Sequence, residues 1–66
     1  MQIGDILNFR DDITDQEVFD AGLYRENIHS SPVKVIDLVE DEYQDQLTQW
    51  VLIEDCIFAY PISFFK

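Results

Sequence analysis

Residue types that carry most enzyme chemistry are scarce in this chain. His29 is its only histidine and Cys56 its only cysteine, so a multi-histidine metal site and an intrachain disulfide are both excluded. Ser30 and Ser31 directly follow His29, but neighbours in sequence do not make a nucleophile and base pair in space. A dyad of Cys56 and His29 would need the tertiary structure to join them. We therefore expect no catalytic residue and no enzyme activity.

Carboxylates are the one abundant reactive group. Asp and Glu number 14 against four Lys and Arg, which gives a net charge of −10. Carboxylate oxygens suit hard cations, but Gln16 and Gln46 stand where the calcium-loop pattern needs glycine. Two carboxylates could share acid–base work in a cleft, but a domain of this length offers little cleft. We expect no bound metal and no cofactor.

Eleven of the 14 acids gather in three clusters along the chain. The first cluster is Asp11, Asp12, Asp15, Glu17 and Asp20, the second is Glu40, Asp41, Glu42 and Asp45, and the third is Glu54 and Asp55. Only Arg10 lies beside any of them in sequence. The simplest interpretation is a charged surface that keeps a small protein in solution.

The size of the net charge favours a more specific interpretation. A globule of this length is about 28 Å across, and B-DNA carries ~16 phosphate charges over that distance, roughly half of them on one side. The charge of −10 is therefore comparable to the charge that a DNA-binding protein meets on one face of a duplex. Solubility alone needs a net charge of about 2–8, and an excess costs stability through self-repulsion.

These features predict an acidic inhibitor of a basic protein, with all three clusters in its binding surface. Carboxylates would replace phosphates and occupy the basic site of a host nucleic-acid-binding or defence protein. Small chains of this kind are typical of phage-encoded proteins, which is an argument by analogy. The second cluster is the first choice because we expect it in a projecting loop, where Tyr43 would add an anchor among the charges.

A non-enzymatic adaptor or accessory module is the alternative function. Its contact would be the apolar C-terminal edge formed by Phe58, Tyr60, Ile62, Phe64 and Phe65. Side chains alternate on a regular strand, so one of the two adjacent phenylalanines is exposed there unless the chain is irregular. An exposed phenylalanine could support a homodimer, whereas core packing is the competing interpretation of this edge.

The composition also restricts partners and location. The acidity argues against anionic membranes and against nucleic acid as a direct ligand. The longest strongly apolar stretches, 50–53 and 57–60, are too short to span a bilayer. The N-terminus lacks the basic and apolar segments of a signal peptide, and a lone cysteine suits a reducing compartment. We expect a cytoplasmic protein, in the host cytoplasm if a phage encodes it.

One small domain over residues 1–66 must position these clusters, since the length supports a single core. Thr14 and Glu17 match a capping box and Gly22 can end a helix, which predicts a short helix over 15–21. Segments rich in β-branched and aromatic residues are predicted to form strands. They cover 1–10, 33–39, 47–54 and 56–60, with a polar hairpin loop over 40–46 and a closing segment over 62–65.

Four to five short strands and one helical turn predict a mostly β domain, a small antiparallel barrel. We place Trp50, Leu52, Val35 and Ile6 in its core. The segment Gly4-Asp5-Ile6-Leu7 resembles the first strand of many SH3-like barrels. The resemblance extends to the long first loop and to the hairpin over 33–53, and it concerns the fold alone.

Overall fold

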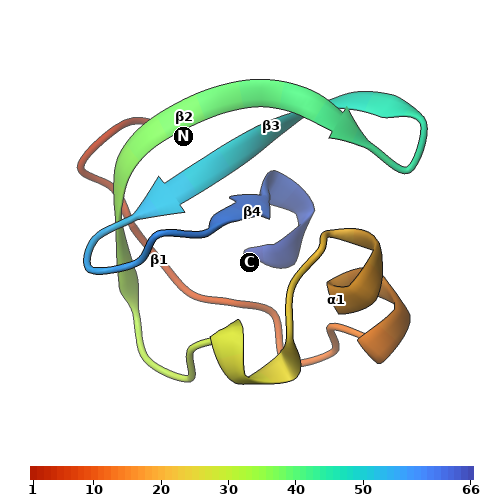
Figure 1. Cartoon of the computed structure of the whole chain (residues 1–66). Coiled ribbons are helices and arrows are strands. Elements are labelled where there is room, and N and C mark those ends of the chain that lie inside the picture. The colour runs from red at the N-terminus through yellow and green to blue at the C-terminus, as the bar shows by residue number, and fades with distance from the viewer.

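A long antiparallel hairpin, made of β2 (Val33–Tyr43) and β3 (Gln46–Ile53), dominates the structure. The computed structural model describes residues 1–66. The other elements are β1 (Ile6–Leu7), α1 (Asp15–Asp20), β4 (Ala59–Pro61) and two 3-10 turns, η1 (Arg25–Asn27) and η2 (Ile62–Phe64). All strand pairs are antiparallel in the order β1-β2-β3-β4. The sheet curls into a half-barrel around the C-terminal segment (Figure 1), which confirms the predicted mostly β fold with one short helix.

The curl of the sheet has a local cause in β2. The pairing of β2 with β3 shifts in register between Val35 and Asp37. Such a bulge bends the strand and increases its twist. The bend lets the start of β2 pair with β1 through Lys34 and Val33, while the rest of β2 pairs with β3.

The predicted helix is confirmed, together with its capping box. The Thr14 side chain accepts the backbone N–H of Glu17, and the Glu17 carboxylate accepts the backbone N–H of Thr14. Gly22 follows the helix with a φ of +75°, a conformation that glycine adopts without steric cost. None of the helices has the length and the apolar content that a membrane crossing requires.

The predicted strand bounds were wrong in three places. The first strand is limited to Ile6–Leu7, with one isolated bridge from Phe9 to Phe65. The expected 40–46 loop is a two-residue turn, because Gln44 and Asp45 have φ values of 52° and 64° that suit a tight hairpin. The acids at 40–42 therefore lie on β2 itself. The strand expected at 56–60 is β4, which begins later, at Ala59.

The core prediction was right for Val35 and wrong for Ile6. Val35 is fully buried with Val51 and Ile53, whereas Ile6 is 62% exposed. Ile6 lies opposite Lys34 on the outer side of an edge strand, so nothing covers it. Trp50 and Leu52 are only partly buried.

Three of the five residues of the C-terminal edge, Tyr60, Phe64 and Phe65, belong to the core. Phe64 is fully buried and Phe65 is 7% exposed, because η2 breaks the strand alternation that would have exposed one of them. Tyr60 is also fully buried, and its ring packs against those of Phe9 and Phe65. Phe58 and Ile62, the other two residues of the edge, are only partly buried.

Candidate functional site

The first acidic cluster is largely neutralised by ion pairs. Glu17 Oε2 accepts Arg10 Nη2 at 2.7 Å, while Glu17 Oε1 faces Thr14. The backbone N–H of Thr14 and the neighbouring Arg10 guanidinium lower the pKa of Glu17 below its ordinary value of 4.5, against an opposing effect of burial. Arg10 also reaches Asp12 at 3.7 Å. Glu17 therefore has two structural roles. It caps the N-terminus of α1, and it forms an ion pair with Arg10, seven residues earlier in the chain.

Two more cations reach this cluster from distant parts of the chain. Arg25 Nη2 lies 2.7 Å from Asp15 Oδ1 and also donates to the carbonyl of Ile13. Lys66 Nζ lies 3.4 Å from Asp11 Oδ2. Three of the four cations thus pair with the first cluster, although only Arg10 lies beside it in sequence.

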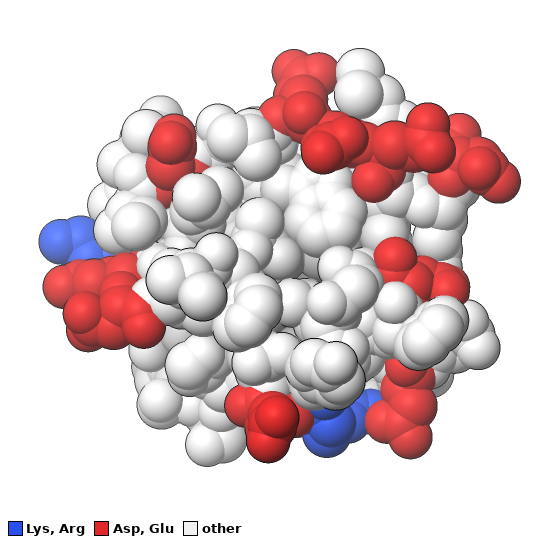
Figure 2. All heavy atoms as spheres, in the orientation of Figure 1, with Lys and Arg blue, Asp and Glu red and all other residues white.

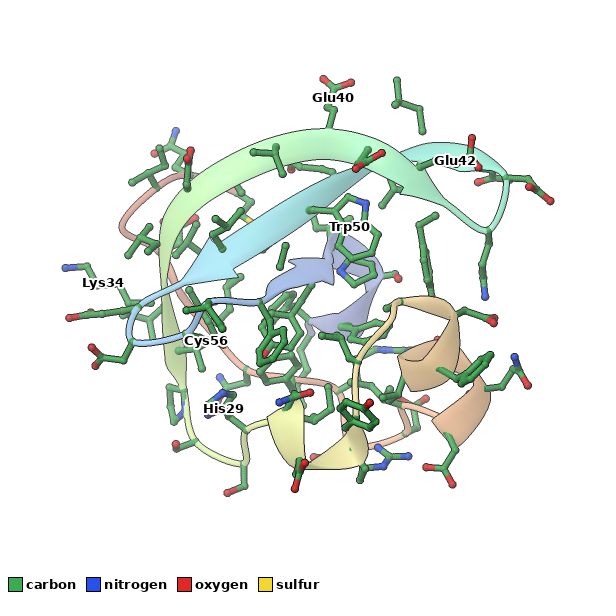
Figure 3. All side chains as sticks on the ribbon, viewed as in Figure 1. His29, Lys34, Glu40, Glu42, Trp50 and Cys56 are labelled. Atoms are coloured by element: carbon green, nitrogen blue, oxygen red, sulfur yellow. The ribbon has the colours of Figure 1, made fainter.

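The second cluster has no ion pair at all. Register places Glu40 opposite Gln49 and Glu42 opposite Leu47, so both glutamates lie on one face of the hairpin. Asp41 lies on the other face, and Asp45 lies in the turn. Figure 2 shows a continuous row of acidic side chains along this edge of the molecule, and Figure 3 shows Glu40 and Glu42 pointing away from the body of the protein. We call Glu40, Asp41, Glu42 and Asp45 the acid row.

Tyr43 lies inside the protein, at the end of the acid row. It is 8% exposed, its hydroxyl donates to the carbonyl of Glu17 at 3.2 Å, and its ring packs against Trp50 and Phe64. Burial is the main cause that raises the pKa of Tyr43, and the negative charges of Glu17 and Asp20 raise it further. Tyr43 therefore ties the hairpin to α1 and is not a surface anchor.

Asp20 lies beside the acid row and lines one hollow with Glu42 and Asp45, whereas Glu54 and Asp55 do not line that hollow. Asp20 accepts side-chain amide hydrogens from Gln16 and Gln44, which brings one member of the first cluster to the hairpin turn. Glu54 and Asp55 form a tight connection after β3, where Asp55 has a φ of 62°. They line one hollow together with Lys34, without an ion pair to it.

His29 and Cys56 do not form a dyad. His29 is exposed and stacks on the ring of Phe9, with centroids 6.0 Å apart. Cys56 Sγ lies 3.3 Å from the hydroxyl of Tyr60, which donates to the carbonyl of Asn27 at 2.7 Å. The pKa of Tyr60 is raised far above its ordinary value, mainly by burial and further by the hydrogen bond with Cys56. No group of three His, Cys, Asp or Glu side chains is arranged to hold a metal ion.

An apolar groove lies beside the acid row. Val39 and Trp50 line it from the hairpin, Leu23 from the segment after α1, and Phe58 from the chain before β4. Asp41 is the one charged residue in its lining, and the volume is about 310 Å³. Figure 2 shows an uncharged hollow below the acidic row, and Figure 3 places Trp50 there, under the hairpin. Sequence reasoning missed this groove because it assigned Trp50 to the core.

Comparison with known proteins finds no matching protein family, no matching curated protein and no matching solved structure.

Proposed function

We propose that this protein binds a basic protein through the acid row and thereby occupies a site that its partner uses for nucleic acid. The observation that carries the proposal is the distribution of ion pairs. Arg10, Arg25 and Lys66 all pair with the first cluster, while the four acids of the row have no cationic partner. An unpaired row exposed to solvent keeps its full field for a partner.

Three acids of the row lie on an extended strand, whose geometry sets the spacing of their charges. Glu40, Asp41 and Glu42 follow one another on an extended strand, which rises about 3.4 Å per residue. One strand of B-DNA carries a phosphate about every 3.4 Å along its axis. Since side chains alternate between the two faces of a strand, Glu40 and Glu42 share one face about 6.8 Å apart while Asp41 lies on the other face. The carboxylates on that face therefore match every second phosphate along the axis of one DNA strand. Lys and Arg of the partner would meet these carboxylates in charge-assisted hydrogen bonds.

The same proposal includes a fold family, a class of partner and a compartment. The half-barrel would be an SH3-like fold whose hairpin carries the row, and the partner would be a host nucleic-acid-binding or defence protein in the cytoplasm. The free thiol of Cys56 is compatible with that reducing compartment. Neither membrane nor nucleic acid is a partner in this proposal.

Capture of basic proteins from a lysate tests the proposal when it is combined with competition. The wild-type chain is immobilised, and captured proteins are eluted with duplex DNA or with salt. A triple variant carries Glu40→Gln, Glu42→Gln and Asp45→Asn, which keeps side-chain shape and removes three charges. We expect the wild type to capture a DNA-binding protein that DNA displaces, and the triple variant to lose it.

A matched control separates the row from net charge. Glu26→Gln, Glu54→Gln and Asp55→Asn remove three exposed charges outside the row, and none of these side chains makes an ion pair. The control should capture the partner as well as the wild type does, with the same loss at high salt. Equal capture by the triple variant and the wild type would refute the proposal, as would a captured protein that DNA cannot displace.

A further inference from the structure

Trp50 is held in a fixed orientation at the apolar groove. Its Nε1 donates to the backbone carbonyl of Asp41 at 3.3 Å. The edge-to-face contact with Tyr43, with ring centroids 5.7 Å apart, supports the indole from a second side. Trp50 is partly exposed and lines the groove, so part of its surface is open to a ligand. An indole that is already oriented binds a planar partner without the entropy cost of ordering it.

Asp41 supplies a single negative charge to this apolar groove. Its Oδ1 accepts the backbone N–H of Glu42 at 2.7 Å, which fixes the carboxylate. Its Oδ2 makes no hydrogen bond, and no cation pairs with the residue. A fixed carboxylate beside an aromatic ring and aliphatic side chains suits a ligand that is cationic at its end and apolar along its stem.

We propose that the groove receives one arginine side chain of the basic partner, with the guanidinium stacked on Trp50 and hydrogen-bonded to Asp41. This inference rests on the proposed function and deepens it, because it names the residue type that the partner presents beside the acid row. A guanidinium is planar, weakly hydrated and able to stack on an aromatic ring, whereas the ammonium of lysine is compact and strongly hydrated. The volume of about 310 Å³ is at the small end of the range of ligand pockets, which suits a single side chain.

A second copy of this chain is a poor occupant of the groove. Two copies would each carry a charge of −10 and would repel. The two arginines of the chain, Arg10 and Arg25, are already held by Glu17 and Asp15. Charge complementarity therefore points to an arginine from a different, basic protein.

The indole N–H signal of Trp50 in a nitrogen-15 NMR spectrum tests this assignment directly, because Trp50 is the only tryptophan. The probes are three capped pentapeptides that carry arginine, lysine or leucine between pairs of glycines. The arginine peptide should shift the Trp50 signal saturably and bind more tightly than the other two. Binding of the leucine or lysine peptide as tight as that of the arginine peptide would overturn the assignment, and so would a Trp50 signal that no peptide shifts.

Asp41→Asn and Asp37→Asn form a matched pair of variants. Asp37 lies on the same strand and accepts the next backbone N–H at 2.8 Å, as Asp41 does at 2.7 Å, but Asp37 does not line the groove. Asparagine can keep that hydrogen bond in both variants. Asp41→Asn should weaken binding of the arginine peptide about tenfold, the typical effect of losing a charge-assisted hydrogen bond, and Asp37→Asn should change it little. Equal effects of the two variants would show that the groove does not recognise the guanidinium.

Failure of this inference differs from failure of the proposed function. If Asp41→Asn leaves the arginine peptide bound as tightly as before, while the triple variant of the acid row loses the captured protein, the arginine assignment is wrong and the proposed function stands. If the triple variant still captures its protein, the proposed function is wrong, whatever the peptides do.

Discussion

Replacement of Glu17 by glutamine should destabilise the protein, because two structural roles depend on that carboxylate. Glu17 Oε1 accepts the backbone N–H of Thr14 at 3.0 Å, and Glu17 Oε2 accepts Arg10 Nη2 at 2.7 Å. A glutamine at this position can keep the hydrogen bond to the backbone N–H of Thr14. It presents only an amide N–H or a neutral oxygen to Arg10, so the ion pair is lost. The side chain of Arg10 is only 29% exposed and its Nε is buried without a hydrogen-bond partner, so water compensates the loss poorly.

The expected cost follows from these contacts. Loss of a hydrogen bond to a charged group costs roughly 1.5–3 kcal/mol, and retention of the cap avoids the further ~1 kcal/mol that an alanine would lose. We expect Glu17→Gln to cost about 1–2 kcal/mol at neutral pH, after a reduction for partial solvent exposure. That is a large share of the roughly 3–10 kcal/mol that a domain of this length possesses.

The pH dependence of that cost gives the sharper test. The pKa of Glu17 is lowered in the folded state, so the native protein binds fewer protons than the unfolded chain in that range. The contribution is therefore fully present above the ordinary value of 4.5 and is lost as pH falls through the lowered pKa. The difference between wild type and Glu17→Gln should shrink in acid.

Urea unfolding followed by Trp50 fluorescence, at neutral pH and well below pH 4.5, measures this difference. Glu26→Gln is the control, because Glu26 is exposed and should change stability by less than about 0.5 kcal/mol. A cost of Glu17→Gln that stays the same at both pH values would refute the electrostatic reasoning. No cost at neutral pH would refute the role of the ion pair.

Three further outcomes follow from burial and charge. Phe64→Ala should cost about 3–5 kcal/mol and unfold much of the population in a circular dichroism melt, because Phe64 is fully buried. Trp50→Ala should cost less, about 2 kcal/mol by the same measurement, because the indole is only partly buried and leaves a smaller cavity; a loss as large as that of Phe64→Ala would contradict this. The triple variant of the acid row should melt at a higher temperature than the wild type in low salt, since it removes self-repulsion, and the two should converge in high salt; a triple variant that melts lower at low salt would show that these acids stabilise the fold.

The fold could be predicted from local sequence signals, and the prediction was correct wherever a local rule decided the structure. Thr14 and Glu17 are a capping box because both hydrogen bonds form within one turn of chain. The β-branched run from Val33 formed the expected strand. The tight turn at Gln44 and Asp45 was not predicted because neither residue is glycine, the usual marker of such a turn. A polar segment that contains a tight turn therefore looks in sequence like a loop.

Burial was harder to predict, because it depends on which elements cover a strand. Ile6 has the residue type of a core position, yet β1 is a two-residue edge strand with its outer side uncovered. Phe64 and Phe65 are both buried because a 3-10 turn rotates one of them inward. Neither outcome follows from alternation along the chain, since each is decided by contacts with segments distant in sequence.

The candidate site depends on where the cations go, and that is a property of the fold. By sequence, Arg10 is the only cation beside the first or the second acidic cluster, and it adjoins the first. In three dimensions Arg25 and Lys66 also reach the first cluster, while the acid row on β2 receives no cation. The net charge of −10 is thus unevenly distributed, and an even distribution would have sufficed for solubility. The unpaired acid row lies beside the groove of Trp50 and Asp41, so the charge that attracts a basic protein and the pocket that can select one of its side chains share one edge of the molecule.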